Sequence, residues 1–175
     1  MVTESFIQEF DREAATTRRV LERVPPDRLT WKPHPKSMSL GTLALHVAAS
    51  PAFIAEWALQ DQIEMSGPMD PSPEPANASE ILAAHDEGVK KTKAALAAIG
   101  DAGMMKDWKL TTKDGATIMG MPKVALVRAI VMNHTYHHRG QLSVYLRLLD
   151  VPVPSIYGPS ADENPFAAAP APAPA

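Results

Sequence analysis

The sequence of 175 residues carries 17 basic and 20 acidic side chains, which gives a formal net charge of -3, and it contains no cysteine. A chain of this length is expected to fold as one domain around a single core. The lack of a basic surplus argues against nucleic-acid binding as the main task. Because cysteine is absent, disulfides and thiolate metal sites are excluded, and any thiol chemistry needs an external thiol.

Neither a signal peptide nor a membrane span is expected. The first residues, Met1–Phe6, lack the basic segment and apolar core of a secretory signal. The most apolar stretch, Leu40–Leu59, is interrupted by His46, Pro51 and Glu56, well short of the apolar length that a span needs. We therefore expect a cytoplasmic protein that does not enter a membrane.

Apolar periodicity predicts two helices in the first third of the chain. The first begins near Thr3, as its N-cap, and ends before Pro25. A polar connection with several prolines then leads to Ser39, which can cap a second helix that runs through His46 toward Trp57. Apolar residues share the side of this helix that carries His46, so we expect the histidine to face the core.

A proline-rich loop over residues 66–76 separates the second helix from the third. The third helix is expected to begin after Asn77, as its N-cap, and to end at Gly100. Between residues 107 and 121, the pair Asp114-Gly115 is typical of a tight turn. A short hairpin can form there, and we expect it to pack on the end of the bundle, because an isolated hairpin is marginally stable.

The fourth helix is expected from Pro122 to about Leu149. Residues 152–175 are rich in proline and alanine and lack the apolar variety needed for packing, so we expect a disordered tail. The folded domain is therefore placed at residues 1–151. Its elements predict an all-α four-helix bundle with the possible hairpin before the last helix.

Three histidines lie within five residues of the fourth helix. Residues four apart differ in direction by about 40°, so His134 and His138 point the same way and can hold one ion. Counted at about 100° per residue, His138 lies near the centre of the apolar stripe, His137 toward its margin, and Arg139 away from it. Gln141 lies one turn beyond His138, where its amide can orient a ligand imidazole.

His46, on the inward side of the second helix, offers a third imidazole. Three neutral imidazoles leave a tetrahedral metal one open position, which is typical of a catalytic site. The alternative is that His134 and His138 are core histidines bonded to polar neighbours. His46 favours a metal, because several buried imidazoles in an apolar bundle are costly without a shared partner. His85 and His34 are expected to form hydrogen bonds and stay outside the ligand set.

Three segments resemble the DinB-like superfamily of four-helix metal-binding proteins. They are Trp31-Lys32-Pro33, Leu40-Gly41-Thr42-Leu43-Ala44-Leu45-His46 and His134-Thr135-Tyr136-His137-His138-Arg139-Gly140-Gln141. The resemblance covers Thr3 to Leu149 and implies an up-down-down-up bundle with a long crossover connection. It also implies a metal held by His46, His134 and His138. Relatives in this superfamily include transferases and isomerases that use a low-molecular-weight thiol as cosubstrate.

We therefore expect a metal-dependent transferase that activates such a thiol for attack on an electrophilic small molecule. The divalent ion is expected to be zinc or nickel, although three imidazoles also suit other first-row metals. No protein side chain is assigned as the catalytic group. A hydrolase acting through a bound water, and a non-enzymatic metal-binding helical stress protein, remain alternatives. No glutamate follows His134 in an HExxH pattern, so a protease-type base is not indicated.

The expected partners are a small-molecule substrate and a second copy of the chain. Apolar residues lie on more than one side of the second helix, including Leu45, Ala48 and Ala58, which favours a homodimer.

The coordination of the metal separates the functional alternatives. A fourth protein ligand such as His85 would favour a structural metal, whereas an open position would favour catalysis.

Overall fold

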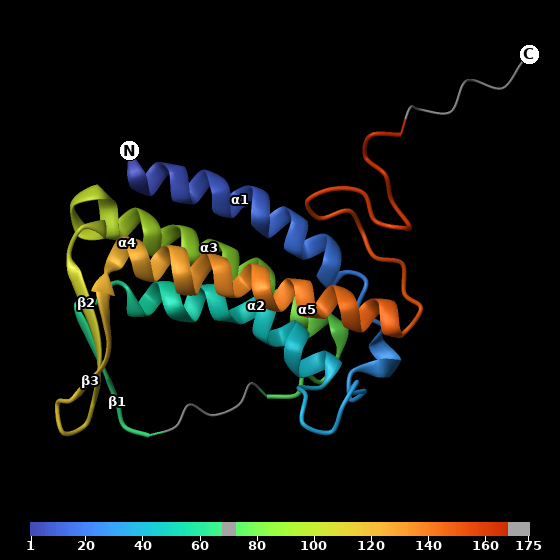
Figure 1. Cartoon of the computed structure of the whole chain (residues 1–175), viewed down its shortest axis with the longest axis horizontal. Coiled ribbons are helices and arrows are strands. Elements are labelled where there is room, and N and C mark those ends of the chain that lie inside the picture. The colour runs from blue at the N-terminus through green and yellow to red at the C-terminus, as the bar shows by residue number, and fades with distance from the viewer. Residues whose placement is uncertain (68–72, 168–175) are drawn as a thin grey trace, which may run out of the picture.

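The computed structural model describes residues 1–67 and 73–167, which form a bundle of four helical rods with a small sheet at one end (Figure 1). The first three rods are α1 (Val2–Leu21), α2 (Leu40–Trp57) and α3 (Ala78–Met104), and a short 3-10 helix, η1 (Pro26–Arg28), follows α1. The fourth rod consists of α4 (Lys123–Leu126), η2 (Val127–Asn133) and α5 (His134–Leu148). Figure 1 shows α1 and α5 running in one direction and α2 and α3 in the other, so α2 ends and α3 begins at opposite ends of the bundle.

Local capping signals identified two of the helix starts correctly. The hydroxyl of Ser39 and the side-chain oxygen of Asn77 each accept the backbone N–H of the residue three positions later. The start of α1 differs from the expectation, because the helix begins at Val2 without a side-chain cap. Thr3 lies inside the helix, where its backbone N–H donates to the Asp101 carboxylate at 2.9 Å.

The sheet has three strands, which lie side by side in the order β1, β2, β3. Their bounds are β1 (Gln62–Met65), β2 (Asp107–Thr112) and β3 (Thr117–Pro122). β2 and β3 form the hairpin expected around Asp114-Gly115, where Gly115 adopts a φ of 85° that favours glycine in a turn. β1 pairs with β2 in parallel, starting with Gln62 opposite Lys109.

The expected all-α class is wrong, because the sheet is part of the fold. β1 has four residues and lies in the connection between α2 and α3, for which no strand was predicted. So short a strand is stable only when it pairs and packs, and its partner β2 is remote in the sequence. Trp108 of β2 ties the sheet to the bundle: it is buried, and its indole N–H donates to the carbonyl oxygen of Trp57.

The buried face of the fourth rod also differs from the expected stripe. In α5 the buried side chains are Thr135, Arg139, Leu142 and Leu146. His138 therefore lies beside this face and not at its centre. The cause is η2, a π-helical stretch whose turns are wider than those of an α-helix. Steps of about 100° counted back from His134 misplace the residues of η2 and, with them, the stripe.

Arg139 was expected to point away from the core, but its side chain is 1% exposed. Its guanidinium donates to the carbonyl oxygen and the carboxylate of Glu13, to the hydroxyl of Thr17 and to the hydroxyl of Tyr157. A buried guanidinium is tolerated when its N–H groups are paired in this way. Periodicity in the fourth helix cannot reveal these partners, because α1 and the C-terminal segment supply them.

The C-terminal segment, residues 152–167, packs on the bundle and corrects the expectation of disorder there. Two ion pairs connect it to the helices: Arg19 with Glu163, and Arg147 with Asp162. The carboxylate of Asp162 also accepts the backbone N–H of Val153, which is buried. The rest of the expected tail, residues 168–175, lies outside the described residues.

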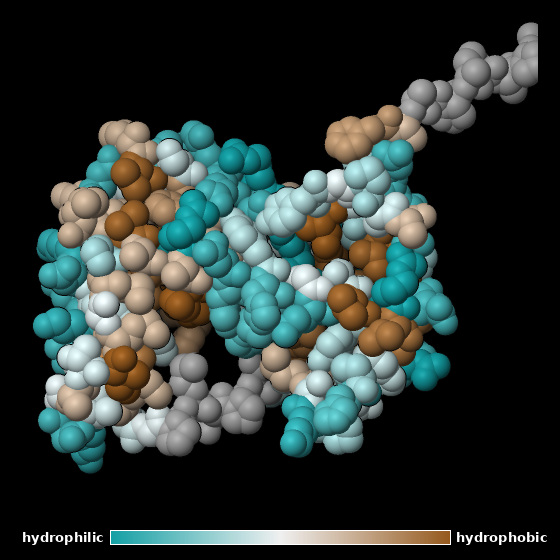
Figure 2. Space-filling model, in the orientation of Figure 1, coloured by the Kyte–Doolittle hydropathy of each residue, from teal (hydrophilic) through white to brown (hydrophobic). Residues whose placement is uncertain are grey.

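In the described part of the chain, no helix has both the length and the hydropathy to cross a membrane. Figure 2 shows hydrophobic residues at the surface of both ends of the molecule, separated by a hydrophilic middle. The three residues that favoured a homodimer, Leu45, Ala48 and Ala58, are all buried within the chain. They therefore provide no surface for a second copy, and the homodimer stays a prediction.

Candidate metal centre

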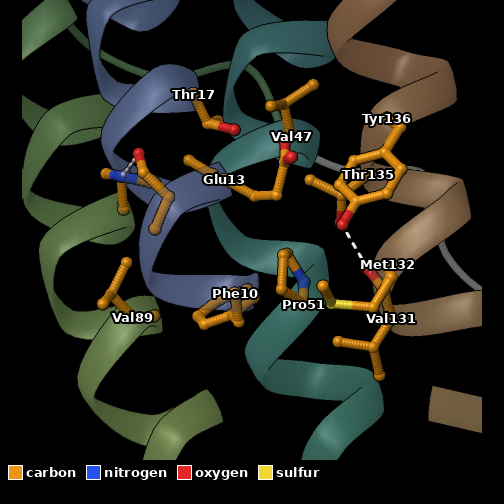
Figure 3. Close-up of a pocket in the computed structure, with 14 residues that line it drawn as sticks. Phe10, Glu13, Thr17, Val47, Pro51, Val89, Val131, Met132, Thr135 and Tyr136 are labelled. Carbon is orange, nitrogen blue, oxygen red and sulfur yellow. Dashed lines mark hydrogen bonds between the residues drawn. The ribbon is translucent and has the colours of Figure 1, made fainter. Parts of the chain in front are cut away.

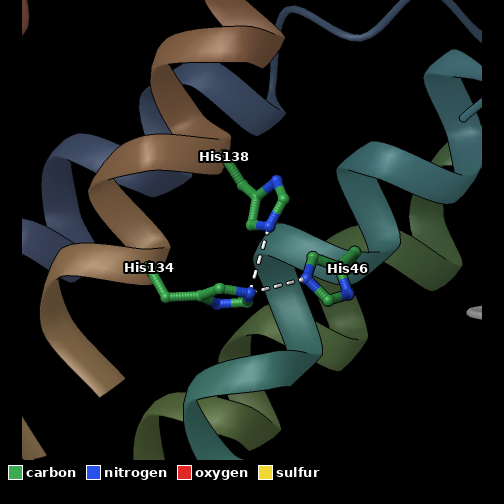
Figure 4. A group of neighbouring side chains, drawn as sticks. All are labelled: His46, His134 and His138. Atoms are coloured by element: carbon green, nitrogen blue, oxygen red, sulfur yellow. Dashed lines mark hydrogen bonds between the residues drawn. The ribbon is translucent and has the colours of Figure 1, made fainter. Parts of the chain in front are cut away.

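Three histidines from two helices point their rings toward one another (Figure 4). His46 lies in α2, and His134 and His138 lie one turn apart at the start of α5. Nε2 of His134 is 3.0 Å from Nε2 of His138 and 3.4 Å from Nε2 of His46. The ligand atoms of the three residues all lie within 4.8 Å of one another. The structure thus brings together the three histidines selected from the sequence.

Two local features place these side chains. The Ser39 cap sets the start of α2, and His46 follows about two turns later, on the side that faces α5. The π-helical η2 ends directly before His134 and so determines the direction in which α5 presents its histidines. Single π-helical turns within α-helices occur frequently at functional sites. The sequence analysis identified no pattern that predicts the π-helical stretch η2.

The side chain of Gln141 orients the ring of His138. Oε1 of Gln141 lies 2.7 Å from Nδ1 of His138. An amide oxygen only accepts hydrogen bonds, so Nδ1 carries the proton and donates it. The lone pair of Nε2 is then left facing the other two histidines. The sequence placed Gln141 one turn from His138, and the structure shows the two side chains in contact; that His138 binds a metal stays a prediction.

The distances from Nε2 of His134 to the other two Nε2 atoms suit a tetrahedral metal ion. Nitrogens bound at roughly 2.0–2.1 Å in a tetrahedral site lie about 3.3 Å apart, which is close to the two Nε2 separations of 3.0 and 3.4 Å. His138 uses its single N–H on Gln141, so its Nε2 lone pair is available to a metal ion. The cluster is therefore compatible with metal binding.

Burial keeps these imidazoles in their neutral form. Burial, reinforced by His138 and His46, lowers the pKa of His134 to about 4. Burial also lowers the pKa of His46. Burial lowers the pKa of His138 as well, although the hydrogen bond that His138 donates to Gln141 opposes this. Because a metal binds the deprotonated ring nitrogen, the lowered pKa values favour the binding-competent form at neutral pH.

His85 is not part of the cluster. Its ring is buried, and Nε2 lies 3.2 Å from the carbonyl oxygen of Ala14 in α1. The residue lines a small cavity between the helices (Figure 3), whose volume of about 10 Å³ is that of about one water molecule. His85 is thus a hydrogen-bonded core histidine, as expected.

The two remaining histidines also lie outside the cluster. Nδ1 of His34 accepts the backbone N–H of Lys36, which agrees with the local bond expected in this loop. His137 is exposed, with its ring centre 4.9 Å from that of His138. Among the described residues, no aspartate or glutamate joins the three-histidine group either. Within the part of the chain that the structure describes, the centre is therefore a cluster of three imidazoles.

One family model and one curated relative match nearly the whole chain. The model of the DinB family matches residues 1–167. The uncharacterized protein YrdA of Bacillus subtilis strain 168 is 25% identical over 158 residues, which are 90% of this chain and 89% of YrdA.

Two solved structures resemble the fold. A DinB-like protein from Bacillus cereus ATCC 10987 has a TM-score of 0.68 at 23% identity, over 88% of this chain and 97% of its own. The DinB-like protein YjoA from Bacillus subtilis has a TM-score of 0.64 at 20% identity, over 85% of this chain and 96% of its own. At these identities the likeness shows a shared fold alone.

Proposed function

The chain belongs to the DinB family, and we propose that it is a metal-dependent transferase that uses a low-molecular-weight thiol. In this proposal His46, His134 and His138 hold one divalent ion, zinc or nickel. The ion would favour the thiolate form of the thiol, which would be transferred whole to an electrophilic small molecule. The thiol must come from outside the protein, because the chain has no cysteine.

The observation that carries the proposal is the convergence of three Nε2 atoms, which no fourth ligand joins among residues 1–67 and 73–167. The described residues within ligand distance are three neutral imidazoles and no carboxylate. A structural zinc site is closed by four protein ligands, whereas a catalytic site keeps one position for a water or a substrate. His85, the side chain considered as a fourth ligand, bonds to Ala14 instead.

A divalent ion held by these residues would lower the pKa of the thiol and favour the thiolate. The chain itself supplies orientation: Gln141 keeps the His138 proton on Nδ1, and burial keeps the histidines neutral. In the transfer, the thiol proton passes to solvent and the sulfur forms a bond to the electrophilic carbon. The leaving group departs with the electron pair of the bond that breaks.

A hydrolase that uses a bound water is the second candidate. Activating water for attack on an ester or amide is commonly assisted by a carboxylate base near the metal. In the part of the chain that the structure describes, no carboxylate belongs to the cluster. Thiol transfer needs no such base once the thiol has ionised, so it is the reaction that the donor set supports better.

The proposal is tested with protein loaded with zinc or nickel, a panel of low-molecular-weight thiols and the uncharged electrophile chlorodinitrobenzene. The absorbance of the thioether measures its formation. We expect the thioether to form faster with metal-loaded protein than with protein treated with a chelator. His134→Ala should abolish the acceleration, and His137→Ala should retain it. Equal rates with and without metal, or with His134→Ala, would refute the transferase.

A further inference from the structure

A cavity of about 620 Å³ opens directly beside the three histidines. His46 and His134 form part of its wall, so the cavity and the cluster are continuous. The volume lies within the range of roughly 300–1,000 Å³ that is typical of small-molecule sites. The cavity can therefore hold a molecule next to the position at which the three Nε2 atoms converge.

Apart from the hydroxyl group of Ser50, the remaining wall is mostly apolar. Phe53, Ile54 and Trp57 of α2 and Ile130 of η2 contribute hydrocarbon and aromatic surface. Among the described residues that line the cavity, none is Asp, Glu, Lys or Arg. A charged group placed there would lose its hydration without gaining an ionic partner, which is costly. The wall therefore favours uncharged ligands.

Phe53 and Trp57 form an aromatic pair at this cavity, with ring centres 4.7 Å apart. The side chain of Phe53 is 50% exposed, although a large apolar side chain is normally buried more completely. Trp57 is partly buried and also stacks near Trp108, which fixes its position at the end of α2. A flat apolar ligand can cover the exposed ring surface of Phe53 and gain from its burial.

The surroundings of the cluster differ on the side of His138. His137 and Gln141 there are exposed polar side chains. Low-molecular-weight thiols are polar molecules, commonly charged at neutral pH, and so do not match the apolar cavity. The apolar cavity therefore suits the electrophile of the proposed transfer, and the polar surface beside His138 suits the thiol.

We propose that this cavity binds the electrophilic substrate and selects molecules with an uncharged, apolar and preferably aromatic body. The ligand lies against Phe53 and Trp57 and presents its reactive carbon beside His46 and His134. The thiol approaches from the side of His137 and Gln141. Naming the ligand as a substrate rests on the proposed transferase function, whereas the selectivity of the cavity does not.

Two fluorescent probes with the same aromatic body test the selectivity. N-phenylnaphthylamine is uncharged, and anilinonaphthalene sulfonate carries one negative charge. Both are titrated into protein treated with a chelator, so that a metal cannot attract the sulfonate. We expect the uncharged probe to bind at least about tenfold more tightly, because none of the described lining residues carries a charge that could pair with the sulfonate. Equal or tighter binding of the sulfonate would overturn the proposal.

Variants then locate the probe. Phe53→Lys places a charge at the cavity and should weaken binding of the uncharged probe by about tenfold or more. The matched control is Leu148→Lys, since Leu148 is similarly exposed at 58% and does not line the cavity. Phe53→Gln, which removes the ring without adding a charge, should also weaken binding. If both Phe53 variants bind like the Leu148 variant, the cavity is not the site.

The same variants separate this inference from the proposed function. If the protein binds no metal or transfers no thiol, the probe results still decide whether the cavity selects uncharged apolar ligands. If the transferase is active, Phe53→Lys should raise KM for chlorodinitrobenzene while leaving KM for the thiol nearly unchanged. An equal rise in both constants would place the electrophile elsewhere.

Discussion

Oε1 of Gln141 lies 2.7 Å from Nδ1 of His138, so one helical turn contains both a candidate metal ligand and the group that orients it. The contact fixes the tautomer of His138 and aims its Nε2 at His134, 3.0 Å away. Such an outer partner restricts the rotation of the ring and raises its basicity as a ligand. The contact needs no metal in order to form, so it prepares the site in advance.

Replacing Gln141 with Ala should weaken metal binding by roughly 10- to 100-fold, because His138 loses the acceptor that orients it. Competition with a chromophoric chelator measures the affinity. His137→Ala is the matched control, since His137 is exposed and lies next to the cluster without joining it. An unchanged affinity in Gln141→Ala would show that the packing of the helix alone orients His138.

Replacing Arg139 with Met should lower the free energy of unfolding by roughly 3–5 kcal/mol, because the carboxylate of Glu13 would lose its buried partner. Urea denaturation measures the change. Arg147→Met is the control: Arg147 also pairs with a carboxylate, but its side chain is 47% exposed, so little change is expected. Equal losses in the two variants would contradict the role given to burial.

Stability should fall as the pH is lowered from neutrality, and His85 should contribute to the fall. Burial holds the pKa of His85 below its ordinary value of 6.5. The unfolded chain therefore binds a proton at this residue at a higher pH than the folded chain does. The contribution is complete above about pH 6.5 and is lost as the pH falls toward the folded pKa.

Urea denaturation at several pH values, in the presence of a chelator, tests the role of His85. His85→Gln can retain a side-chain donor near the carbonyl of Ala14 but cannot titrate. The variant should lose less stability between about pH 7 and pH 5 than the wild type. The same loss in both proteins would show that other groups account for the acid sensitivity.

Ending the chain after Pro159 should lower the melting temperature by several degrees. The truncation removes Asp162 and Glu163, whose carboxylates accept the backbone N–H groups of Val153 and Ser155. The exposed ion pairs of the same carboxylates with Arg147 and Arg19 add little. For a domain of this size, about 1 kcal/mol corresponds to roughly 2–4 °C. Circular dichroism during heating measures the change. An unchanged melting temperature would show that the contacts of residues 160–167 contribute nothing to stability.

The sequence was sufficient to select the histidine cluster, because the spacing of His134 and His138 is a local property of a helix. His46 could be added because its neighbours in α2 define an inward side. The position of Gln141 followed from the same helical geometry. These inferences depend on a few successive turns and do not require knowledge of the whole fold.

The errors arose where distant parts of the chain decide the structure. β1 exists because it pairs with β2, and the burial of Arg139 depends on Glu13 and Tyr157. The π-helical η2 changes the direction of its residues relative to those of α5, so the buried face differs from the one counted for an α-helix. Each residue of η2 is compatible with an ordinary α-helix. Ion pairs connect the C-terminal segment to the helices. Its proline and alanine content predicted disorder and gave no sign of these pairs.

The metal content of purified protein tests the central claim most directly. Wild type, His134→Ala and His137→Ala are loaded with zinc or with nickel, freed of unbound ions and analysed by mass spectrometry. Wild type and His137→Ala should each retain about one ion per chain, and His134→Ala should lose most of it, because two imidazoles leave an incomplete site. Full occupancy in His134→Ala, or no bound ion in the wild type, would contradict a metal site built from His46, His134 and His138.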